Sequence, residues 1–261
     1  MIRKTAVTPR MLRLTVGGEA LRGFEAGAVA DERVKLFFPP DGEVAPALPV
    51  FDATGMHFPE GAPLPHARNY TVRRFDADRL ELDLDFVVHG TGRACDWAVR
   101  AEPGALLGLA GPAGGMVPAA TADLHLFAGD ETALPAIATL VERLPEGARA
   151  LVFVEVADAR EEQPLDVPAG TDVEIRWLHR GTGPWRTPTP LERAVRAFGW
   201  PDGEVHAWVA GEAAMVRELR RQLRHERRLP RENLHATGYW RLGRTVEQWV
   251  QEEGEPRAED D

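Results

Sequence analysis

Arginine and aromatic side chains are concentrated in residues 68–74, whose sequence is Arg-Asn-Tyr-Thr-Val-Arg-Arg. In an extended strand alternate side chains share a face, so Arg68, Tyr70 and Val72 project together. A guanidinium group pairs with two phosphate oxygens at once, and a ring beside it suits a flat aromatic ligand that carries phosphate. The alternative is a surface strand whose arginines form salt bridges, so the choice depends on the segments downstream.

A second candidate is the turn at residues 89–97, where Gly90 and Gly92 precede the pattern of a short helix. Backbone N–H groups at the start of a helix carry positive potential, and glycines let a diphosphate come close to them. Glycine turns before helices are also common without any ligand. The position of this turn directly after a strand, in the same half of the chain as Tyr70, favours phosphate binding.

Two further turns lie in the second half of the chain, at residues 129–132 (Gly-Asp-Glu-Thr) and 211–212 (Gly-Glu). Each follows an apolar run typical of a parallel strand, and ligands bind at the carboxyl ends of such strands. There is no Gly-x-Gly-x-x-Gly motif, so the sequence does not support the standard diphosphate-binding loop of dinucleotide-binding domains. The alternative is that Asp130 or Thr132 only caps a helix. The aromatic pair at residues 239–240 ends the last predicted strand and can cover a ligand.

Several other kinds of chemistry are excluded by composition. The eight histidines are scattered without metal-ligand spacing, and the absence of serine excludes a Ser-His-Asp site. The single cysteine, Cys95, excludes an intramolecular disulfide framework and fits a reducing compartment. A net charge of -10 argues against general binding of nucleic acid or membrane surfaces. The basic run at 217–228 also contains acids and an apolar stripe, which is typical of a solvated helix face.

The N-terminus lacks a signal-peptide pattern, and no apolar run is long enough to span a bilayer. We therefore expect a soluble cytoplasmic protein, and we expect it to be a monomer.

The first third of the chain has the alternation of antiparallel strands, with the clearest period of two at residues 80–88. Sequential strands without intervening helices predict a small barrel. A Pro/Gly/Ala-rich excursion at 41–66 interrupts the strands, and a Gly/Pro cluster at 111–115 is the best candidate for a domain boundary. The other strands expected in this part of the chain are 11–16, 33–38, 68–75 and 106–110. One short helix is expected at 93–99.

From about residue 120 strands and helices alternate, which predicts a parallel sheet with helices on both faces. The expected strands are 124–128, 150–156, 173–178, 205–210 and 234–240, with helices near 134–144, 191–198, 216–223 and 245–250. The fold class is thus an antiparallel β-barrel followed by a five-stranded parallel α/β domain. The predicted domains are 1–119 and 120–253, with an acidic and disordered tail at 254–261.

This order of elements resembles the ferredoxin reductase-like flavoenzymes and, more narrowly, the siderophore-interacting proteins, which are FAD-dependent ferric-siderophore reductases. Matching segments run in the family's order from near the N-terminus to about residue 250. They are Val34-Lys-Leu36, Arg68-Asn-Tyr-Thr-Val-Arg73, Asp85-Phe-Val-Val-His-Gly90, Gly111-Pro112, Ala128-Gly-Asp-Glu-Thr-Ala-Leu-Pro-Ala-Ile137, Ala210-Gly-Glu212 and Gly238-Tyr-Trp-Arg-Leu-Gly243.

The resemblance implies a role for each matching residue. An antiparallel FAD-binding barrel would precede a nicotinamide-binding domain, with Tyr70 packed on the isoalloxazine and Trp240 near the flavin or adenine. The remaining FAD contacts implied are Arg68, Thr71, His89, Gly90, Gly92 and Ala94, with Asp130, Thr132 and Ala133 on the far side of the cofactor. Strict alternation points Thr71 away from Tyr70, so the strand must twist or bulge if both touch flavin.

The implied reaction transfers hydride from NADH or NADPH to FAD and single electrons to a siderophore-bound iron(III), with no catalytic side chain and no resident metal. Lys35 matches a lysine that meets the acidic substrate, and Arg73 and Arg74 are further candidates for a locally basic entrance. The alternatives are another flavin reductase on this scaffold, with a flavodoxin-like or small organic acceptor, and a siderophore-binding flavoprotein without turnover. The choice of nicotinamide stays open, because Asp158 suits ribose hydroxyls and Arg160 suits a 2′-phosphate.

Overall fold

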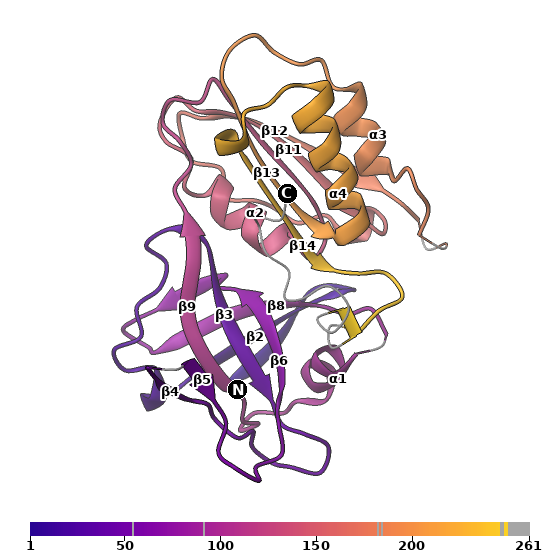
Figure 1. The fold of residues 1–261 in the computed structure, drawn as a ribbon. Coiled ribbons are helices and arrows are strands. Elements are labelled where there is room, and N and C mark those ends of the chain that lie inside the picture. Colours follow the sequence, from indigo (N-terminus) through magenta and orange to yellow (C-terminus); the bar gives the residue numbers. More distant parts are fainter. Residues whose placement is uncertain (54, 91, 182, 184, 246–247, 250–261) are drawn as a thin grey trace. The chain divides into compact units, whose positions relative to one another are not determined.

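Antiparallel strands form the first of two units, Met1–Met116, and a parallel sheet forms the second, Val117–Asp261, in the computed structural model (Figure 1). The structure describes residues 1–261 except 54, 91, 182, 184, 246–247 and 250–261. The tail at 254–261, Thr91 and part of the helix expected over 245–250 therefore lie outside the described residues. Within the described part, every helix falls short of the length and apolar character that a membrane span requires.

The first unit contains a four-stranded and a three-stranded antiparallel sheet, with orders β1-β2-β8-β7 and β6-β3-β9. Alternate apolar residues such as Leu14, Leu36 and Leu84 point from both sheets into one core. The elements are β1 (Arg3–Thr8), β2 (Met11–Gly17), β3 (Ala30–Phe38), β6 (His66–Thr71), β7 (Arg74–Asp76), β8 (Glu81–Val87), α1 (Arg93–Arg100) and β9 (Gly108–Met116), with a 3₁₀ turn at Glu19–Leu21. This barrel-like arrangement confirms the predicted fold class of the first unit.

The strand predicted over 68–75 is interrupted, which corrects that prediction. The Val72 N–H donates to the Glu32 carbonyl of β3 (2.8 Å), whereas the Arg73 N–H donates to the Asp83 carbonyl of β8 (3.0 Å). The chain passes from one sheet to the other here, and the consecutive residues Thr71 and Val72 are both buried. The departure from strict alternation expected near Thr71 is therefore present.

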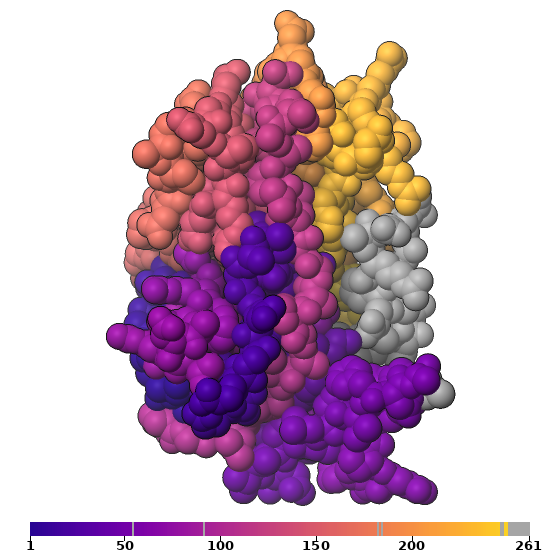
Figure 2. Space-filling view, turned by 90° about the vertical axis from the view of Figure 1, so that its left-hand side faces the viewer, coloured from indigo at the N-terminus to yellow at the C-terminus, as the bar shows by residue number. Residues whose placement is uncertain are grey.

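Two segments of the first unit form strands where loops are expected. The Gly/Pro cluster 111–115 continues β9, because Ala113 and Gly114 pair with β3 beside a bulge. The excursion 41–66 contains a hairpin of β4 (Val50–Asp52) and β5 (Gly55–His57), anchored where Phe58 meets the Phe37 ring edge-to-face at 5.7 Å. The purple surface at the bottom of Figure 2 belongs to the excursion 41–66.

The second unit is a five-stranded parallel sheet, as predicted, and its strand order is β12-β11-β10-β13-β14. Its three central strands are near-continuous apolar runs because both faces are covered, with α3 and α4 on one face and α2 on the other (Figure 1). The elements are β10 (Leu124–Asp130), α2 (Leu134–Val141), β11 (Arg149–Val156), β12 (Asp172–His179), α3 (Pro190–Ala197), β13 (Val205–Glu212), α4 (Ala213–Arg221), a π-helical turn (Gln222–Glu226) and β14 (Leu234–Trp240), with 3₁₀ turns at Ala159–Glu161 and Arg231–Asn233.

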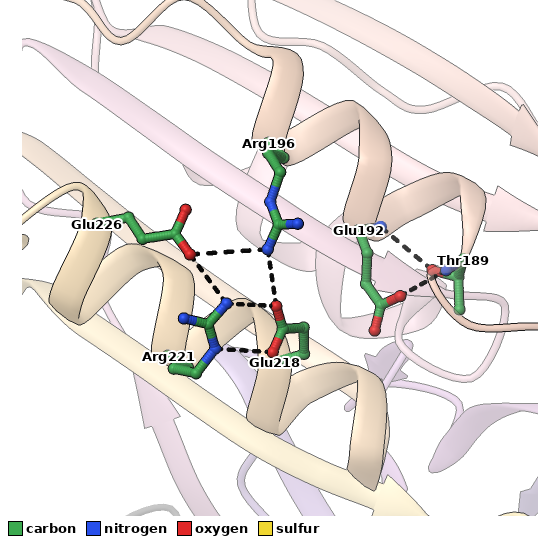
Figure 3. Close-up of polar contacts among 6 residues, drawn as sticks. All are labelled: Thr189, Glu192, Arg196, Glu218, Arg221 and Glu226. Carbon is green, nitrogen blue, oxygen red and sulfur yellow. Dashed lines mark hydrogen bonds and ion pairs between the residues drawn. The ribbon is translucent and has the colours of Figure 1, made fainter.

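Helices α3 and α4 are joined by charged side chains (Figure 3). Arg196 of α3 pairs with Glu218 of α4 at 2.8 Å and lies 3.7 Å from Glu226. Arg221 pairs with the same two acids at 2.7 and 2.9 Å. Two guanidinium groups thus share two carboxylates, which fixes the relative orientation of the helices that cover this face. A capping box between Thr189 and Glu192 starts α3.

Candidate functional site

The carboxyl edge of the parallel sheet brings together the two acidic turns that the sequence singles out. In the order β12-β11-β10-β13-β14 the direction of connection reverses between β10 and β13, and ligands of such sheets bind at this switch point. Asp130 ends β10 and Glu212 ends β13, and Gly129 is in register with Ala210. The two turns therefore lie side by side at the switch point.

The Asp130 carboxylate is turned into the protein and accepts four hydrogen bonds. Its Oδ1 atom accepts from the Thr132 backbone N–H (2.9 Å) and hydroxyl (2.5 Å). Its Oδ2 atom accepts from the Glu212 backbone N–H and from the Trp240 indole, both at 2.9 Å. Only 1% of the residue is exposed. Asp130 therefore connects the ends of β10, β13 and β14.

The glycines of both turns are explained by this close approach. Gly211 has φ +136°, and a Cβ placed there would lie 2.6 Å from the Asp130 Oδ2 atom. A Cβ on Gly129 would lie 2.4 Å from the Ala133 Cβ and 2.7 Å from the Ala210 carbonyl oxygen. Both distances are too short for any side chain. Glycine is thus required because a carboxylate and a helix start fill the space between the strands.

Glu212 has a similar role one strand further along. Its Oε2 atom accepts from the Met215 N–H and caps α4, and its Oε1 atom accepts from the Leu242 N–H at 3.2 Å. The chain after β14 is consequently held by two buried carboxylates, Asp130 through Trp240 and Glu212 through Leu242.

Burial dominates the electrostatics of this edge. Desolvation, followed by the charge of Glu131, raises the pKa of Asp130 to about 6, although its hydrogen bonds favour the ionised form. Burial also raises the pKa of Glu155 at the end of β11, whose Oε2 atom accepts from the Leu191 N–H. Arg180, directly after β12, pairs with Glu131 through both terminal nitrogens. This cation offsets part of the acidic charge.

An aromatic pair completes the edge. The Trp240 ring meets the Trp185 ring edge-to-face, with centroids 5.3 Å apart and planes at 85°. The Arg180 guanidinium lies 5.1 Å from the centre of the Trp185 ring. Asp130, Trp240, Trp185, Arg180 and Glu131 therefore form a closed circuit of contacts, in which the first and last residues are neighbours in sequence. Sequence reasoning missed Trp185 and Arg180, because both lie in a loop without periodicity.

The residues predicted on this edge differ in accessibility. Thr132 and Trp240 are half-buried, whereas Asp130 and Ala133 are fully buried. The Ala133 N–H donates a hydrogen bond to the Asp130 carbonyl at 3.0 Å. Direct contact between a cofactor and these four residues stays a prediction. Because Asp130 and Ala133 are buried, we expect them to support the residues that touch a cofactor and not to touch it themselves.

The first unit brings Arg68 and Tyr70 to one face of β6, as alternation predicts. They are in register with the core residues Leu36 and Val34 of β3. The half-buried Tyr70 ring lies against Phe86, with centroids 4.1 Å apart and planes at 32°, and burial raises the pKa of its phenol. Arg68 donates to the Ala67 carbonyl at 2.7 Å. The result is a fixed aromatic ring with a guanidinium two residues away.

The turn that follows β8 is open. Gly90 has φ +85° and Gly92 has φ +122°, and a Cβ added at Gly90 would meet nothing within 4 Å. Gly92 is the N-cap of α1, and no side chain of the described residues caps it, while Ala94 is buried below and His89 is exposed. A backbone that ligand atoms can approach at Gly90, before a helix whose N-cap receives no side-chain hydrogen bond, fits a diphosphate. At Gly92 the His89 ring lies 3.3 Å from the position of an added Cβ.

Arg93 is a further cation at this turn that sequence reasoning missed. It follows Gly92 directly and pairs with Asp41, at the start of the excursion, at 2.8 Å. Its guanidinium holds the pKa of Asp41 below the usual range. The signal was available as a basic residue at the first position of a helix after a glycine turn.

The three basic residues predicted at a substrate entrance do not share one strand. Lys35 lies on β3 opposite Asn69, on the face that alternates with Val34 and Tyr70. Arg73 follows the passage between the sheets, and Arg74 begins β7. Arg74 lines a small polar pocket whose other residues are Arg3, Asp76, Arg79, Glu81 and Asp83. The pocket has three cations and three acids, so its charge is mixed.

Two family models match consecutive parts of the chain. Residues 1–116 match the siderophore-interacting FAD-binding domain, and residues 122–243 match the siderophore-interacting protein model. The ferric vibriobactin reductase ViuB of Vibrio cholerae is 37% identical over 96% of this chain and 91% of its own length. An NADPH-dependent ferric-chelate reductase of Escherichia coli is 32% identical over 92% of this chain and 91% of its own.

Solved structures agree with this assignment. A siderophore utilization protein from T. fusca superposes with a TM-score of 0.82 at 40% identity, covering 94% of this chain and 92% of that one. A ferredoxin reductase of a carbazole 1,9a-dioxygenase reaches a TM-score of 0.64 at 16% identity, over 90% of this chain and 65% of that one, which shows the shared ferredoxin reductase-like fold alone. The chain therefore belongs to the siderophore-interacting protein family, and it is an FAD-dependent oxidoreductase.

Proposed function

We propose that this protein is a ferric-siderophore reductase, which moves electrons from NADH or NADPH through FAD to iron(III) held by a siderophore. The observation that carries the proposal is the glycine turn at Gly90 and Gly92, open at Gly90, together with the fixed Tyr70 ring in the same unit, which matches the FAD-binding model. Bound FAD accepts two electrons together and releases them singly, which is the conversion that this reaction needs. The names of the Vibrio cholerae and Escherichia coli relatives support a ferric chelate as the acceptor.

In the first unit, we propose that the backbone at His89, Gly90, Gly92 and Ala94 binds the FAD diphosphate. The positive φ values of Gly90 and Gly92, the open space at Gly90 and a helix start without a side-chain cap support this proposal. Tyr70, held against Phe86, supplies a flat surface for the isoalloxazine, and Arg68 and Thr71 supply polar contacts. Thr71 is buried beside the passage between the sheets.

In the second unit, the resemblance implies FAD contacts for Asp130, Thr132, Ala133 and Trp240. From their place at the switch point of the parallel sheet we propose instead that this carboxyl edge binds the nicotinamide donor. Thr132 and the Trp240 indole border the site, and Asp130 and Ala133 support them from beneath. The name of the Escherichia coli relative supports NADPH as a donor. In this proposal iron is cargo and not a resident cofactor.

Reduction to iron(II) weakens binding by hard oxygen ligands, so the metal leaves its chelator after electron transfer. Many such chelates are anionic, and a protein of net charge -10 repels them unless the entrance is locally basic. We propose Lys35, Arg73 and Arg74 for this role, in a monomeric protein that acts in the cytoplasm.

The purified protein tests the main proposal directly. We expect it to be yellow from bound FAD, to bleach on anaerobic mixing with NAD(P)H, and to regain its colour when a ferric siderophore is added, while a ferrous chelator reports iron(II). Absence of flavin contradicts the proposal. Bleaching without reoxidation by any ferric chelate, but with reoxidation by a quinone, favours another reductase on this scaffold, and binding without bleaching favours a carrier.

The basic entrance is tested by charge removal. We expect Lys35→Ala and Arg73→Ala each to raise KM for an anionic ferric chelate by about 3- to 10-fold at low salt, with kcat unchanged, because each removes attraction and no reacting group. Arg22→Ala, which removes an exposed arginine paired with Glu19, is the matched control. Unchanged KM in both variants excludes these residues from the entrance.

A further inference from the structure

We propose that Asp130 is a positioning residue with divided tasks: its Oδ2 atom fixes the Trp240 indole at the switch point, and its Oδ1 atom takes up a proton without disturbing that indole. The idea deepens the proposed function, because the indole borders the proposed dinucleotide site, but its geometry belongs to the protein alone.

The Oδ2 side is built from donors only. The Glu212 N–H and the Trp240 Nε1–H both point at Oδ2, at 2.9 Å each. Neither group can accept a hydrogen bond, so a proton on Oδ2 would have no acceptor and would oppose two N–H groups. A bulge brings the indole here: Gly211 pairs with Gly238, but Glu212 pairs with Trp240, so Tyr239 is the extra residue of β14.

The Oδ1 side contains one partner that can reverse its role. The Thr132 hydroxyl donates to Oδ1 when the carboxylate is ionised, and a hydroxyl can rotate to accept instead. A proton on Oδ1 therefore keeps this hydrogen bond in the opposite direction. Both contacts at Oδ2 also remain in direction, although they and the Thr132 N–H then meet an uncharged and weaker acceptor.

The pKa of Asp130 is high enough for the carboxyl group to take up a proton at mildly acidic pH. The charged and titratable groups around it are Glu131 on its own turn, Glu155 from β11, Arg180 after β12 and Glu212 from β13. Arg180 is paired with Glu131, and burial raises the pKa of Asp130 to about 6. The carboxyl group therefore changes charge at mildly acidic pH, and the division of tasks keeps the indole in place.

A second contact restrains the same indole. The edge-to-face contact with Trp185 holds the ring from the direction of β12, and Trp185 is itself covered by Arg180. A ring held at its Nε1 atom and at one further aromatic contact has little rotational freedom, which lowers the entropic cost of binding a ligand against it.

The indole N–H of Trp240 is the readout. We propose NMR of the FAD-loaded protein labelled with ¹⁵N at the tryptophan indoles, with Trp240→Phe assigning the resonance and no substrate present. In Asp130→Asn the amide oxygen replaces Oδ2 and the NH₂ group donates to the Thr132 hydroxyl, so we expect the resonance to stay near its wild-type position. In Asp130→Ala we expect it to move and its exchange with water to accelerate by about tenfold or more, because a charge-assisted hydrogen bond is lost.

Two outcomes overturn the proposal: a Trp240 resonance that is unchanged in Asp130→Ala, and an Asp130→Asn variant that behaves like Asp130→Ala. Between pH 8 and 5 the wild-type resonance should move only slightly, as the charge on the acceptor is lost, and a shift as large as that of Asp130→Ala contradicts the division of tasks. Thr132→Val keeps the fold of the turn but removes the reversible hydroxyl, so here the indole should respond to pH. Glu218→Gln, on α4, is the control and should leave the Trp240 resonance unchanged.

The kinetic consequence is separate. We expect Asp130→Ala to raise KM for NAD(P)H with a smaller effect on kcat, and Asp130→Asn to restore most of the loss. If the NMR result holds and KM is unchanged, the indole is positioned as proposed but does not border the dinucleotide, and the proposed function has to place the donor elsewhere.

Discussion

At the scale of single residues, the choice between nicotinamide donors depends on two side chains that neutralise each other. Asp158 follows β11, where an acid suits ribose hydroxyls, and its Oδ1 atom accepts from the Arg160 N–H at 3.0 Å. The Arg160 guanidinium pairs with both carboxylate oxygens, at 2.9 and 2.8 Å, and this pairing raises the pKa of Arg160. The two residues that pointed to opposite donors thus form one unit.

We expect Arg160→Ala to lower the ratio of kcat/KM for NADPH over that for NADH by about tenfold, because the 2′-phosphate loses a bidentate partner and meets an unpaired acid. Asp158→Asn should raise the same ratio. Arg176→Ala, which breaks a comparable exposed pair with Glu174 on β12, should leave it unchanged. A ratio insensitive to both Arg160 and Asp158 places the ribose elsewhere.

The sequence located the acidic turns at the strand ends but did not reveal that their carboxylates face inward. The orientation of Asp130 depends on the positive φ of Gly211 and on the extra residue Tyr239, and neither leaves a periodic signal. The alternative that Asp130 or Thr132 caps the helix was wrong, because the N-cap of α2 is Ala133 and receives no side-chain hydrogen bond, although the Thr132 N–H does donate to Asp130 within the turn. The placement of Arg68 and Tyr70 was easier to predict from the sequence, because the period of two of a strand is enough to put them on one face.

At the scale of elements, helices α3 and α4 depend on shared charges. Exposed ion pairs contribute little individually, but Glu218 serves both Arg196 and Arg221, which holds its pKa below the usual range. We expect Glu218→Gln to lower the free energy of unfolding by at most about 1 kcal/mol, an effect that disappears in high salt.

Chemical denaturation at low and high ionic strength measures this difference. Glu174→Gln, which breaks a single exposed pair within β12, is the matched control and should have almost no effect. An equal loss in both variants, or a loss that persists in high salt, contradicts a contribution from the shared pairs.

Element prediction succeeded where burial imposes a pattern and failed where pairing overrides composition. The buried runs that form β10, β11 and β13 were found from their apolar sequence, as was β8 from its alternation. Strand β1 was missed, since its side chains are mostly exposed and lack alternation. The Gly/Pro cluster 111–115 indicated a boundary by composition, but its pairing with β3 makes it a strand.

At the scale of the whole molecule, buried acids set the dependence of stability on pH. Burial raises the pKa values of Asp130, Glu155 and Glu192, so the folded state binds protons more tightly than the unfolded chain. The contribution of Asp130 to stability therefore increases as the pH falls through about 6 and is absent at higher pH, and Glu155 and Glu192 act in the same direction. Burial lowers the pKa of His125, which acts in the opposite sense below its ordinary range.

We expect the free energy of unfolding to increase from pH 8 to about pH 6, helped by the decrease in net negative charge. Urea titrations at several pH values measure it. Asp130→Asn should flatten the dependence, because the group no longer titrates, whereas Asp41→Asn, at an exposed acid, should leave its shape unchanged. A stability that increases steadily up to pH 8 contradicts this account.

The close approach of Gly211 to Asp130 has a consequence for how such a sequence can change. Any side chain at 211 collides with the carboxylate, and loss of the carboxylate leaves the donors of Glu212 and Trp240 unsatisfied. Each position therefore constrains the substitutions tolerated at the other, although 81 positions separate them along the chain (211 minus 130). Among descendants of this protein, the two residues should be inherited or replaced as a pair, and a library that varies both should contain active combinations that neither single change can reach.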